Sequence, residues 1–330
     1  MKSYVSFSNV TYKTISPAMK INFFLLLIIN VSFSLAQEKE FNSAVVKINK
    51  YIEGTLVAPY SDSDKEAPLV IFIMDAGAIN RDGNDRMSKN DTFKQFSYEL
   101  AKLGISTYRY DKRLFKMDGL GIREHEISFD HYIEDARSTI DYFKKNGNYT
   151  KIFVAGHGQG SLIGMISGKG KADGFISIAG NADSIDQVII EQIAKQAPGL
   201  DKSATVAFNQ LRENGRATSY DPALESIFRY DLQAFMRSWV KYNPSEEITQ
   251  LEIPILLIHG DKDIQVELSQ AEKLKESVPQ AEYIIVQNMN HILKEIKGNS
   301  RLENHKSYNE SWRKIMPEVL NGIANFVNQQ

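Results

Sequence analysis

The sequence contains no cysteine, which excludes disulfide bonds and a lipid-modified N-terminal cysteine. It has no Lys/Arg-rich stretch interleaved with aromatic residues, and its formal net charge is −2, so nucleic acid is not an expected partner. The phosphate-loop pattern G-x-x-x-x-G-K-[ST] is absent as well. What is present, 42% apolar and 24% charged residues, is typical of a globular protein whose stability depends on its core.

No apolar run is long enough to predict a membrane span, and the longest run lies near the N-terminus. Residues 21–29 are apolar except for Asn22, follow Met19 and Lys20, and precede a small residue, Ala36. This pattern predicts a secretory signal peptide in residues 1–36, with residues 1–18 as an upstream extension and Met19 as the alternative start. The alternative is an uncleaved membrane anchor, although the run is short for a membrane span. We therefore expect an exported chain of residues 37–330 without a stable membrane span after cleavage.

Strand and helix patterns alternate along most of residues 37–330. The predicted strands are 51–57, 69–74, 105–110, 152–155, 174–179, 255–259 and 283–286, and the predicted helices are 91–103, 131–146 and 311–327. Such alternation favours an α/β fold with a mostly parallel central sheet and helices on both of its faces.

The segment Val154–Ser161 has the context of a nucleophile elbow, a sharp turn between a strand and a helix. A buried strand precedes it and a helix start follows it, and glycines at 156 and 160 suit backbones that nearly touch. The elbow pattern G-x-S-x-G places its serine at the position of Gly158. The sequence thus predicts the turn without the nucleophile.

The other two members of a Ser–His–acid triad follow in the expected order. Asp263 lies in the loop after predicted strand 255–259, and His291 lies after strand 283–286. In a triad the imidazole takes a proton from the nucleophile and the carboxylate holds its tautomer. Residues 260–266 have the G-x-x-D-x-x-V form of an acid loop, which makes Asp263 the carboxylate and Asp261 the less favoured candidate.

Three motifs make the chain similar to α/β-hydrolase-fold proteins, and to the secreted bacterial carboxylesterase or serine aminopeptidase-like group in particular. They are residues 69–84, ending Arg-Asp-Gly-Asn, residues 108–113, Tyr-Arg-Tyr-Asp-Lys-Arg, and residues 242–247. Two departures lie near the expected site: Asp75, Ala76 and Ala78 replace Gly, Ser and Pro, and Leu114–Met117 replaces a Gly-rich run.

The resemblance implies an oxyanion hole formed by the backbone N–H groups of Gln159 and Ala76. It also implies a helical cap over the site, in about residues 181–247, where helices are predicted at 184–196, 203–213 and 232–240. Asp75 either repels the developing oxyanion or points away and bonds the turn backbone, and the commonness of Asp in turns favours the second orientation.

Three hypotheses for the function follow. The first is an exported hydrolase of small carboxylic esters, descended from a Ser–His–Asp mechanism in which Gly158 leaves ordinary turnover in doubt. The second is a non-catalytic descendant that binds a small apolar or acyl ligand. The third, an engineered nucleophile knockout, is disfavoured by the native-looking signal peptide. A relocated nucleophile at Ser161 is less plausible than a capping or packing role. No cofactor and no metal are expected, because the histidines lack metal-site spacing.

Overall fold

The computed structural model describes residues 40–60 and 66–330. The predicted signal peptide, residues 1–36, lies outside the described residues, so its prediction stays one made from sequence. No helix within the described ranges combines the length and the apolar character that crossing a membrane requires.

The described residues form one eight-stranded sheet in the order β1-β2-β4-β3-β5-β6-β7-β8. Its strands are β1 (Phe41–Lys47), β2 (Glu53–Pro59), β3 (Ala67–Ile73), β4 (Ser106–Tyr110), β5 (Tyr149–His157), β6 (Gly174–Ile178), β7 (Ile255–Gly260) and β8 (Glu282–Val286). β1, β2 and β4 pair antiparallel, and from β4 to β8 all pairings are parallel. The predicted mostly parallel sheet is confirmed.

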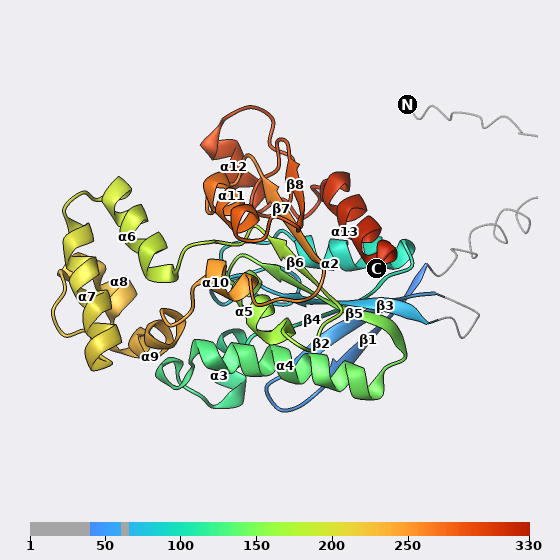
Figure 1. The fold of residues 1–330 in the computed structure, drawn as a ribbon, viewed down its shortest axis with the longest axis horizontal. Helices are drawn as coiled ribbons and strands as arrows, with labels where there is room; N and C mark the ends of the chain where they lie inside the picture. Colours follow the sequence, from blue (N-terminus) through green and yellow to red (C-terminus); the bar gives the residue numbers. More distant parts are fainter. Residues whose placement is uncertain (1–39, 61–65) are drawn as a thin grey trace, which may run out of the picture. The chain divides into compact units, whose positions relative to one another are not determined.

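Helices cover both faces of this sheet (Figure 1). One face carries α2 (Thr92–Lys102) and α13 (Pro317–Gln329), and the other carries α4 (Phe129–Asn146), α5 (Gln159–Gly168) and α11 (Leu268–Ser277). Strand β3 shows why both faces are apolar: Ile71 belongs to one core cluster, and its neighbour Phe72 belongs to the other. Successive side chains of a strand point to opposite faces, so a continuous apolar run feeds two cores.

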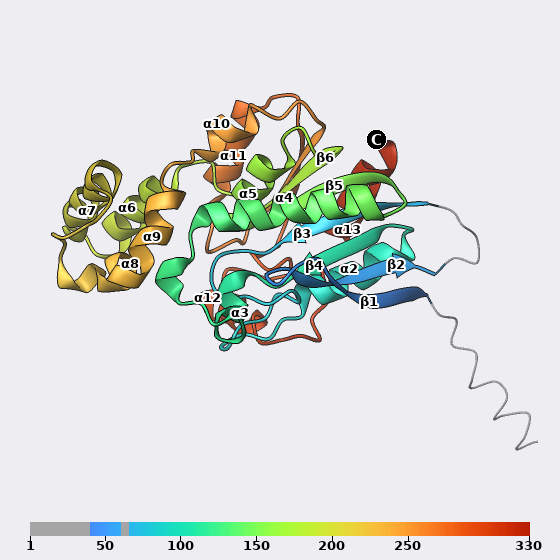
Figure 2. The same ribbon diagram turned by 90° about the horizontal axis from the view of Figure 1, so that it is seen from below.

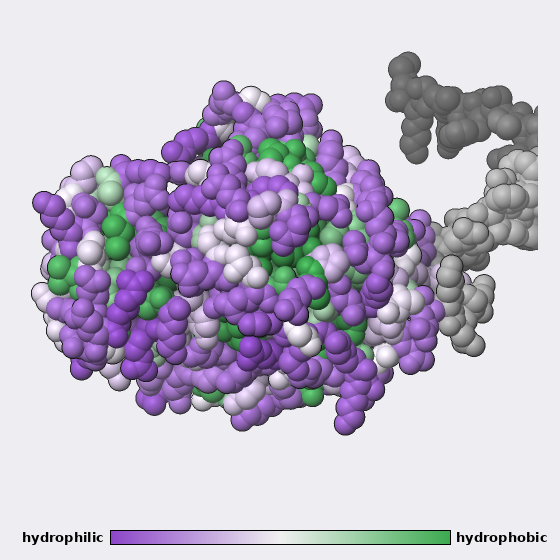
Figure 3. Space-filling view, viewed as in Figure 1, coloured by the Kyte–Doolittle hydropathy of each residue, from purple (hydrophilic) through white to green (hydrophobic). Residues whose placement is uncertain are grey.

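The chain between β6 and β7 forms a helical insertion, which we define as residues 181–247. It contains α6 (Ile185–Gln196), α7 (Leu200–Asn214), η2 (Pro222–Leu224), α8 (Glu225–Phe228) and α9 (Tyr230–Trp239), and it ends within α10 (Pro244–Ile248). Figure 2 shows α6 to α9 grouped together at the left, next to one end of α4. They share a core cluster of their own, around Phe208, Leu211 and Phe228. In the face shown in Figure 3, apolar residues are visible only in small groups between hydrophilic ones.

Several element boundaries differ from the sequence prediction. The last helix begins at Pro317 rather than at residue 311, because residues before it bond the loop after β8: Met316 N–H donates to the Leu293 carbonyl at 3.0 Å. Helix α4 begins at Phe129, since the Ser128 hydroxyl caps it by accepting from His131 N–H. Strand β1 and the shorter helices α3 (Arg113–Leu120), η1 (Glu124–Glu126) and α12 (Arg301–Ser307) were not predicted.

Candidate active site

The turn from β5 into α5 has the tight backbone that its glycines predict. Gly158 lies at φ 52° and ψ −117°, which disfavours residues with a side chain. A Cβ on Gly156 would lie 2.5 Å from the Cα of Ser161, and one on Gly160 would lie 2.9 Å from the Met74 carbonyl oxygen. The turn therefore lies directly against the carboxyl end of β3, where Asp75 follows.

The carboxylate of Asp75 fills the space that a side chain at position 158 would occupy. A Cβ built on Gly158 would overlap Oδ1 and Cγ of Asp75 and would lie 2.9 Å from Oδ2. Oδ1 accepts a hydrogen bond of 2.8 Å from the backbone N–H of Gln159, the predicted oxyanion-hole donor. The carboxylate of Asp75, from the loop after β3, thus occupies both the place of the nucleophile and the hole.

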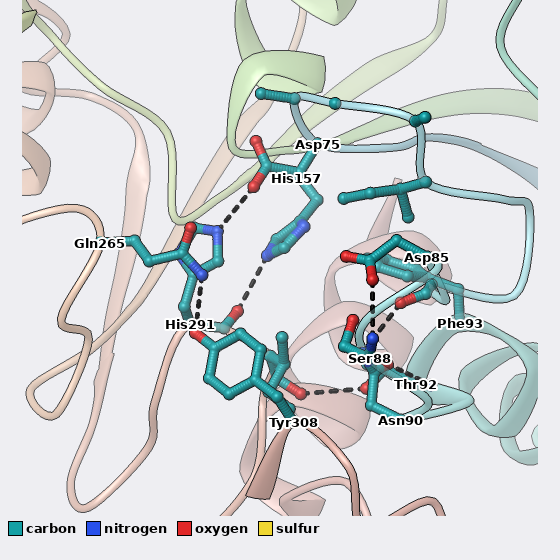
Figure 4. Close-up of a pocket in the computed structure, with 16 residues that line it drawn as sticks. Asp75, Asp85, Ser88, Asn90, Thr92, Phe93, His157, Gln265, His291 and Tyr308 are labelled. Atoms are coloured by element: carbon teal, nitrogen blue, oxygen red, sulfur yellow. Dashed lines mark hydrogen bonds and ion pairs between the residues drawn. The ribbon is translucent and has the colours of Figure 1, made fainter. Parts of the chain in front are cut away.

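Asp75, His291 and Asp263 form one continuous chain of hydrogen bonds. His291 Nε2 lies 2.9 Å from Asp75 Oδ2, a contact that Figure 4 draws. His291 Nδ1 lies 2.7 Å from Asp263 Oδ2. The side chains of His291 and Asp263 are 2% and 1% exposed, and that of Asp75 is 14% exposed. The arrangement is that of a triad in which a carboxylate from the loop after β3 lies where the serine hydroxyl would be.

This geometry keeps His291 protonated. A neutral imidazole carries one N–H, whereas a carboxylate faces each of the two ring nitrogens here, so both bonds require the imidazolium form. Burial lowers the pKa of His291, but the charges and hydrogen bonds of Asp263 and Asp75 outweigh it and raise the pKa to about 10. Burial likewise opposes ionisation of Asp75, yet His291 and the Gln159 N–H hold its pKa well below the usual range.

Two further buried side chains, those of His157 and Lys112, hydrogen-bond the backbone of the site residues. His157 Nε2 donates to the backbone oxygen of His291 at 2.8 Å, and burial lowers the pKa of His157 to about 4, which keeps it neutral. The ammonium of Lys112 donates to the backbone oxygen of Asp75, and burial lowers its pKa to about 8 against the attraction of the Asp75 charge. The backbone at Asp75 and the backbone at His291 are thus each held by a side chain from a neighbouring segment.

Two of the sequence motifs that carry the family resemblance, residues 69–84 and 108–113, contact each other next to the site. Arg81 pairs with Asp111 at 2.5 Å, and Asp82 pairs with Arg109 at 3.0 Å. Asp111 and Arg109 are nearly completely buried, and charged groups in such places require partners. These ion pairs fasten the loop that follows Asp75 to β4 and so fix where the Asp75 backbone lies.

Two pockets meet at this loop. The first, of about 230 Å³, is lined by Asp75, His157, His291, Gln265 and Tyr308 among others, most of which Figure 4 labels. The second, of about 270 Å³, lies beneath α9 and is mostly apolar; its lining includes Leu114, Tyr132, Phe235, Met236 and Trp239. Ala76 and Gly77 line both pockets. A ligand in either pocket would therefore contact the loop beside Asp75.

The structure brings the predicted site residues together at the carboxyl ends of β3, β5, β7 and β8. Gly158, Gln159, Asp263 and His291 surround one point, and Ala76 borders it. Their catalytic roles stay predictions.

Asp261 and Ser161, the alternative candidates for the acid and the nucleophile, bond to residues outside the hydrogen-bonded chain through His291. Asp261 accepts from the N–H of Asn288 at 2.5 Å, as a turn residue does. Ser161 is buried, and its hydroxyl lies 2.7 Å from that of Ser177. Ser161 is therefore a packing residue.

The favoured orientation of Asp75 was wrong. Its carboxylate does accept from the turn backbone, but it points into the site and not away from it. The absence of a Cβ at Gly158 opens the space, and the imidazolium of His291 attracts the anion. The sequence contains a signal for this orientation. The side chain is lost at position 158, and a carboxylate is gained at position 75 of the same site. These two departures were treated separately in the prediction from sequence.

Three potential metal ligands lie close together. One ligand atom each from Asp75, His157 and His291 fall within 4.8 Å of one another. The atoms are in use, since His291 Nε2 bonds Asp75 and His157 Nε2 bonds the His291 backbone. A cation here would displace the proton between His291 and Asp75. That no metal binds stays a prediction.

Comparison with known proteins places the chain in a family. Residues 86–295 match the family model described as serine aminopeptidase, S33. The chain belongs to this family of α/β hydrolases. It is 26% identical over 264 residues to esterase EstD of Thermotoga maritima, covering 76% of the chain, and it spans 61% of that esterase's length.

Solved structures show the same fold. Est1E from Butyrivibrio proteoclasticus superposes with a TM-score of 0.55 and 15% identity over 87% of this chain and 99% of its own. The 2,6-dihydroxy-pseudo-oxynicotine hydrolase gives a TM-score of 0.52 with 16% identity over 92% of this chain and 71% of its own. The predicted α/β-hydrolase fold is therefore confirmed.

Proposed function

We propose that this chain binds a small ester-like or acyl ligand and does not hydrolyse esters through an acyl-serine at the elbow. The proposal rests chiefly on one observation, that the Asp75 carboxylate occupies the space of a side chain at position 158. With respect to ester hydrolysis the chain is then a non-catalytic descendant of the esterases that it resembles.

Each part of a serine-hydrolase mechanism is lost in a different way. Glycine at 158 offers no oxygen for an acyl-enzyme. The Gln159 N–H already donates to a carboxylate, so a developing oxyanion would have to displace a negative charge. The imidazolium of His291 holds the proton that a general base would have to accept.

The ligand class is argued from the pockets. The space beneath α9 is mostly apolar and suits an acyl chain or an aromatic ring, while the first pocket offers polar groups of Asp75, His157 and Tyr308. Because Ala76 and Gly77 line both, one small molecule could place its apolar part in one pocket and its polar part in the other.

The test is hydrolysis of a short-chain p-nitrophenyl ester by the chain and three variants. We expect no turnover above background by the wild type, by Gly158→Ser or by Asp75→Gly. Gly158→Ser alone fails because its side chain meets the Asp75 carboxylate. The double variant Asp75→Gly/Gly158→Ser frees the hole and supplies the hydroxyl, and we expect it to exceed Gly158→Ser by about 10²–10³-fold, the usual effect of an oxyanion-hole donor. Wild-type turnover together with labelling of a defined serine by an active-site serine probe would disprove the proposal.

We also propose that the chain is exported and that the signal peptide ends at Ala36. The support is the sequence pattern of residues 19–36, a short positive start, an apolar core and a small residue at the end. Expression of the full sequence in a bacterial host, followed by fractionation and intact mass measurement, tests it. A product that begins at Gln37 outside the cytoplasm is expected, whereas a membrane-bound product that retains residues 19–36 would indicate an anchor instead.

A further inference from the structure

The most exposed large apolar side chains of the described residues lie in two segments that contact each other. Met87, Leu302 and Trp312 are 86%, 79% and 74% exposed, more than any other large apolar side chain in residues 40–60 and 66–330. Single exposed apolar side chains are ordinary on a protein surface, whereas a group of them at one place marks an interaction site. The surroundings of these three side chains then indicate the kind of partner.

The first segment is the loop of residues 85–89, and the second is residues 295–314, which include α12. A backbone bridge between the residues on either side closes the second segment into a loop. The N–H of Lys89 donates to the side-chain oxygen of Asn309 at 3.1 Å, so the two segments lie side by side. We call the two segments together the α12 surface.

The α12 surface is basic, although the whole chain carries a formal net charge of −2. It contains seven Lys and Arg residues against four Asp and Glu residues. Glu303 and Glu310 both pair with Arg313, and Glu310 also pairs with Lys306. The other five cations are exposed and form no ion pair within the described residues: Arg86, Lys89, Lys297, Arg301 and Lys314. They can therefore meet anions from outside the chain.

Apolar and basic side chains lie on the same side of α12. Leu302, His305 and Lys306 are exposed on this helix. Asn304 and Ser307 are buried. Residues three and four positions apart share one side of a helix, so Leu302 and Lys306 project from the same side. An apolar side chain and a cation therefore reach the same partner.

We propose that the α12 surface docks on a membrane surface that contains anionic phospholipids. The unpaired cations would lie among the phosphate groups, and the three apolar side chains would enter the boundary between headgroups and acyl chains. Tryptophan favours this boundary because its ring is apolar and its N–H is polar.

Other partners fit the α12 surface less well. A symmetric contact with a second copy would bring two surfaces of the same positive charge together. Lysine is also depleted in interfaces between proteins, whereas phosphate groups at a membrane attract it. The combination of unpaired cations with exposed apolar side chains therefore favours the anionic membrane.

The α12 surface also forms part of the wall of the first pocket. Asp85, Ser88 and Tyr308 belong to this surface and line that pocket, where Figure 4 labels them. A small apolar or acyl ligand that left a docked bilayer would therefore meet the pocket directly. Only this route for the ligand rests on the proposed function, and docking itself does not.

Binding to lipid vesicles tests the proposal. We use residues 37–330, which hold every described residue and lack the apolar run at 21–29. The chain should float with vesicles of equal parts phosphatidylglycerol and phosphatidylcholine, and should stay unbound with phosphatidylcholine alone. Because salt screens exposed charges, binding should weaken as the ionic strength rises.

Two pairs of charge variants locate the contact. Each basic residue near an anionic membrane contributes about fivefold to the partition coefficient, so Arg301→Ser/Lys306→Ser should lower it roughly 25-fold. Lys144→Ser/Lys145→Ser is the charge-matched control. Both of its lysines are exposed at the end of α4, close to the start of β5 and thus at the opposite edge of the sheet. This control should lower the partition coefficient by less than about twofold.

The apolar contact has a readout of its own. Trp239→Phe leaves Trp312 as the single tryptophan, and vesicles with brominated acyl chains should quench its emission. Met87→Ser/Leu302→Ser should lower the partition coefficient by about tenfold or more, since two partly inserted apolar side chains are lost.

Three results would overturn the proposal: no flotation with the mixed vesicles, equal losses in the two pairs of charge variants, or unquenched Trp312 in the bound chain. A chain that ignores vesicles but sediments as a dimer, which Trp312→Ser dissociates, would assign the surface to a second copy instead. Ester turnover enters none of these measurements. Failure of the docking proposal would therefore leave the proposed function standing, and the reverse also holds.

Discussion

At the scale of single residues, Gly158 and Asp75 are understood only together. Glycine at 158 leaves a space at the end of β5, and the carboxylate from the end of β3 fills it. A charge with 14% of its side chain exposed needs compensation, which His291 and the Gln159 N–H supply. Replacing either residue alone therefore leaves a clash or an unpaired charge.

The protonation of His291 is the most direct test of this pairing. We expect its imidazole to be charged at pH 7 and to titrate near pH 10, because carboxylates lie on both sides of it. A pKa raised above the ordinary value of 6.5 stabilises the folded state fully below about pH 6.5, and this contribution is lost as the pH rises through about 10. Imidazole nitrogen shifts measured by NMR between pH 5 and 11 report the titration.

Asp75→Asn is the matched variant for this titration, since it keeps the shape of the side chain and removes its charge. We expect the pKa of His291 to fall, while the Asp263 bond persists. An unchanged pKa in Asp75→Asn would mean that Asp263 alone sets the protonation of His291.

The sequence alone predicted that Asp263, His291 and Gly158 lie at one site. Each follows a predicted strand, and the carboxyl ends of parallel strands share one edge of the sheet. The sequence did not place Asp75, since local propensity assigns an aspartate after a strand to a turn. What decides its orientation is a missing Cβ on β5 and a cation after β8, which local sequence does not contain. The role of Lys112, whose ammonium bonds the Asp75 backbone, was missed for the same reason.

At the scale of elements, the glycines of the turn between β5 and α5 allow this turn to approach the end of β3. Gly160 faces the end of β3, and a Cβ there would lie 2.7 Å from the Ile73 carbonyl carbon. We expect Gly160→Ala to lower the free energy of unfolding by about 1–3 kcal/mol, as overpacking usually does. Urea denaturation followed by far-UV circular dichroism measures the change.

Gly168→Ala is the control on the same helix. Its Cβ would lie 3.5 Å from the Cβ of Ala172, an ordinary contact. Alanine also has the higher helix propensity, so this variant should be neutral or more stable by up to about 0.5–1 kcal/mol. Equal losses in both variants would show that the close approach at Gly160 does not limit stability.

The existence of the elements with long apolar patterns followed from periodicity, whereas element boundaries and the exposed or short elements depended on partners. The apolar run of β3 serves two cores and was predictable from its residues. The start of α13 was not, because Lys294 and Ile315 form a bridge between the loop after β8 and the segment before the helix. Strand β1 was missed because most of its residues are exposed, and its pairing with β2 is what makes it a strand.

At the scale of the whole molecule, the helical insertion has a core separate from those of the sheet. Its cluster around Phe208 and Phe228 contains no residue of the two sheet clusters. Among the described residues, two partly buried side chains, Phe235 and Trp239, pack against both this cluster and a sheet cluster. Trp239 stacks on Phe129 of α4, with ring centres 5.4 Å apart and planes at 4°. The apolar pocket beneath α9 lies at this junction, so ligand binding there would depend on how firmly the insertion is held.

We therefore expect the insertion to detach from α4 at a lower urea concentration than that at which the sheet unfolds, because its apolar core is separate and, of the described side chains, only Phe235 and Trp239 pack against both clusters. The chain has two tryptophans, and Trp312 is 74% exposed, so Trp312→Phe leaves Trp239 as the reporter. Its emission should shift to longer wavelength before the far-UV circular dichroism signal is lost. The complementary variant Trp239→Phe should show no early shift. Coincident transitions in Trp312→Phe would mean instead that insertion and sheet unfold as one cooperative unit, and that the stacking of Trp239 on Phe129 is as stable as the sheet itself.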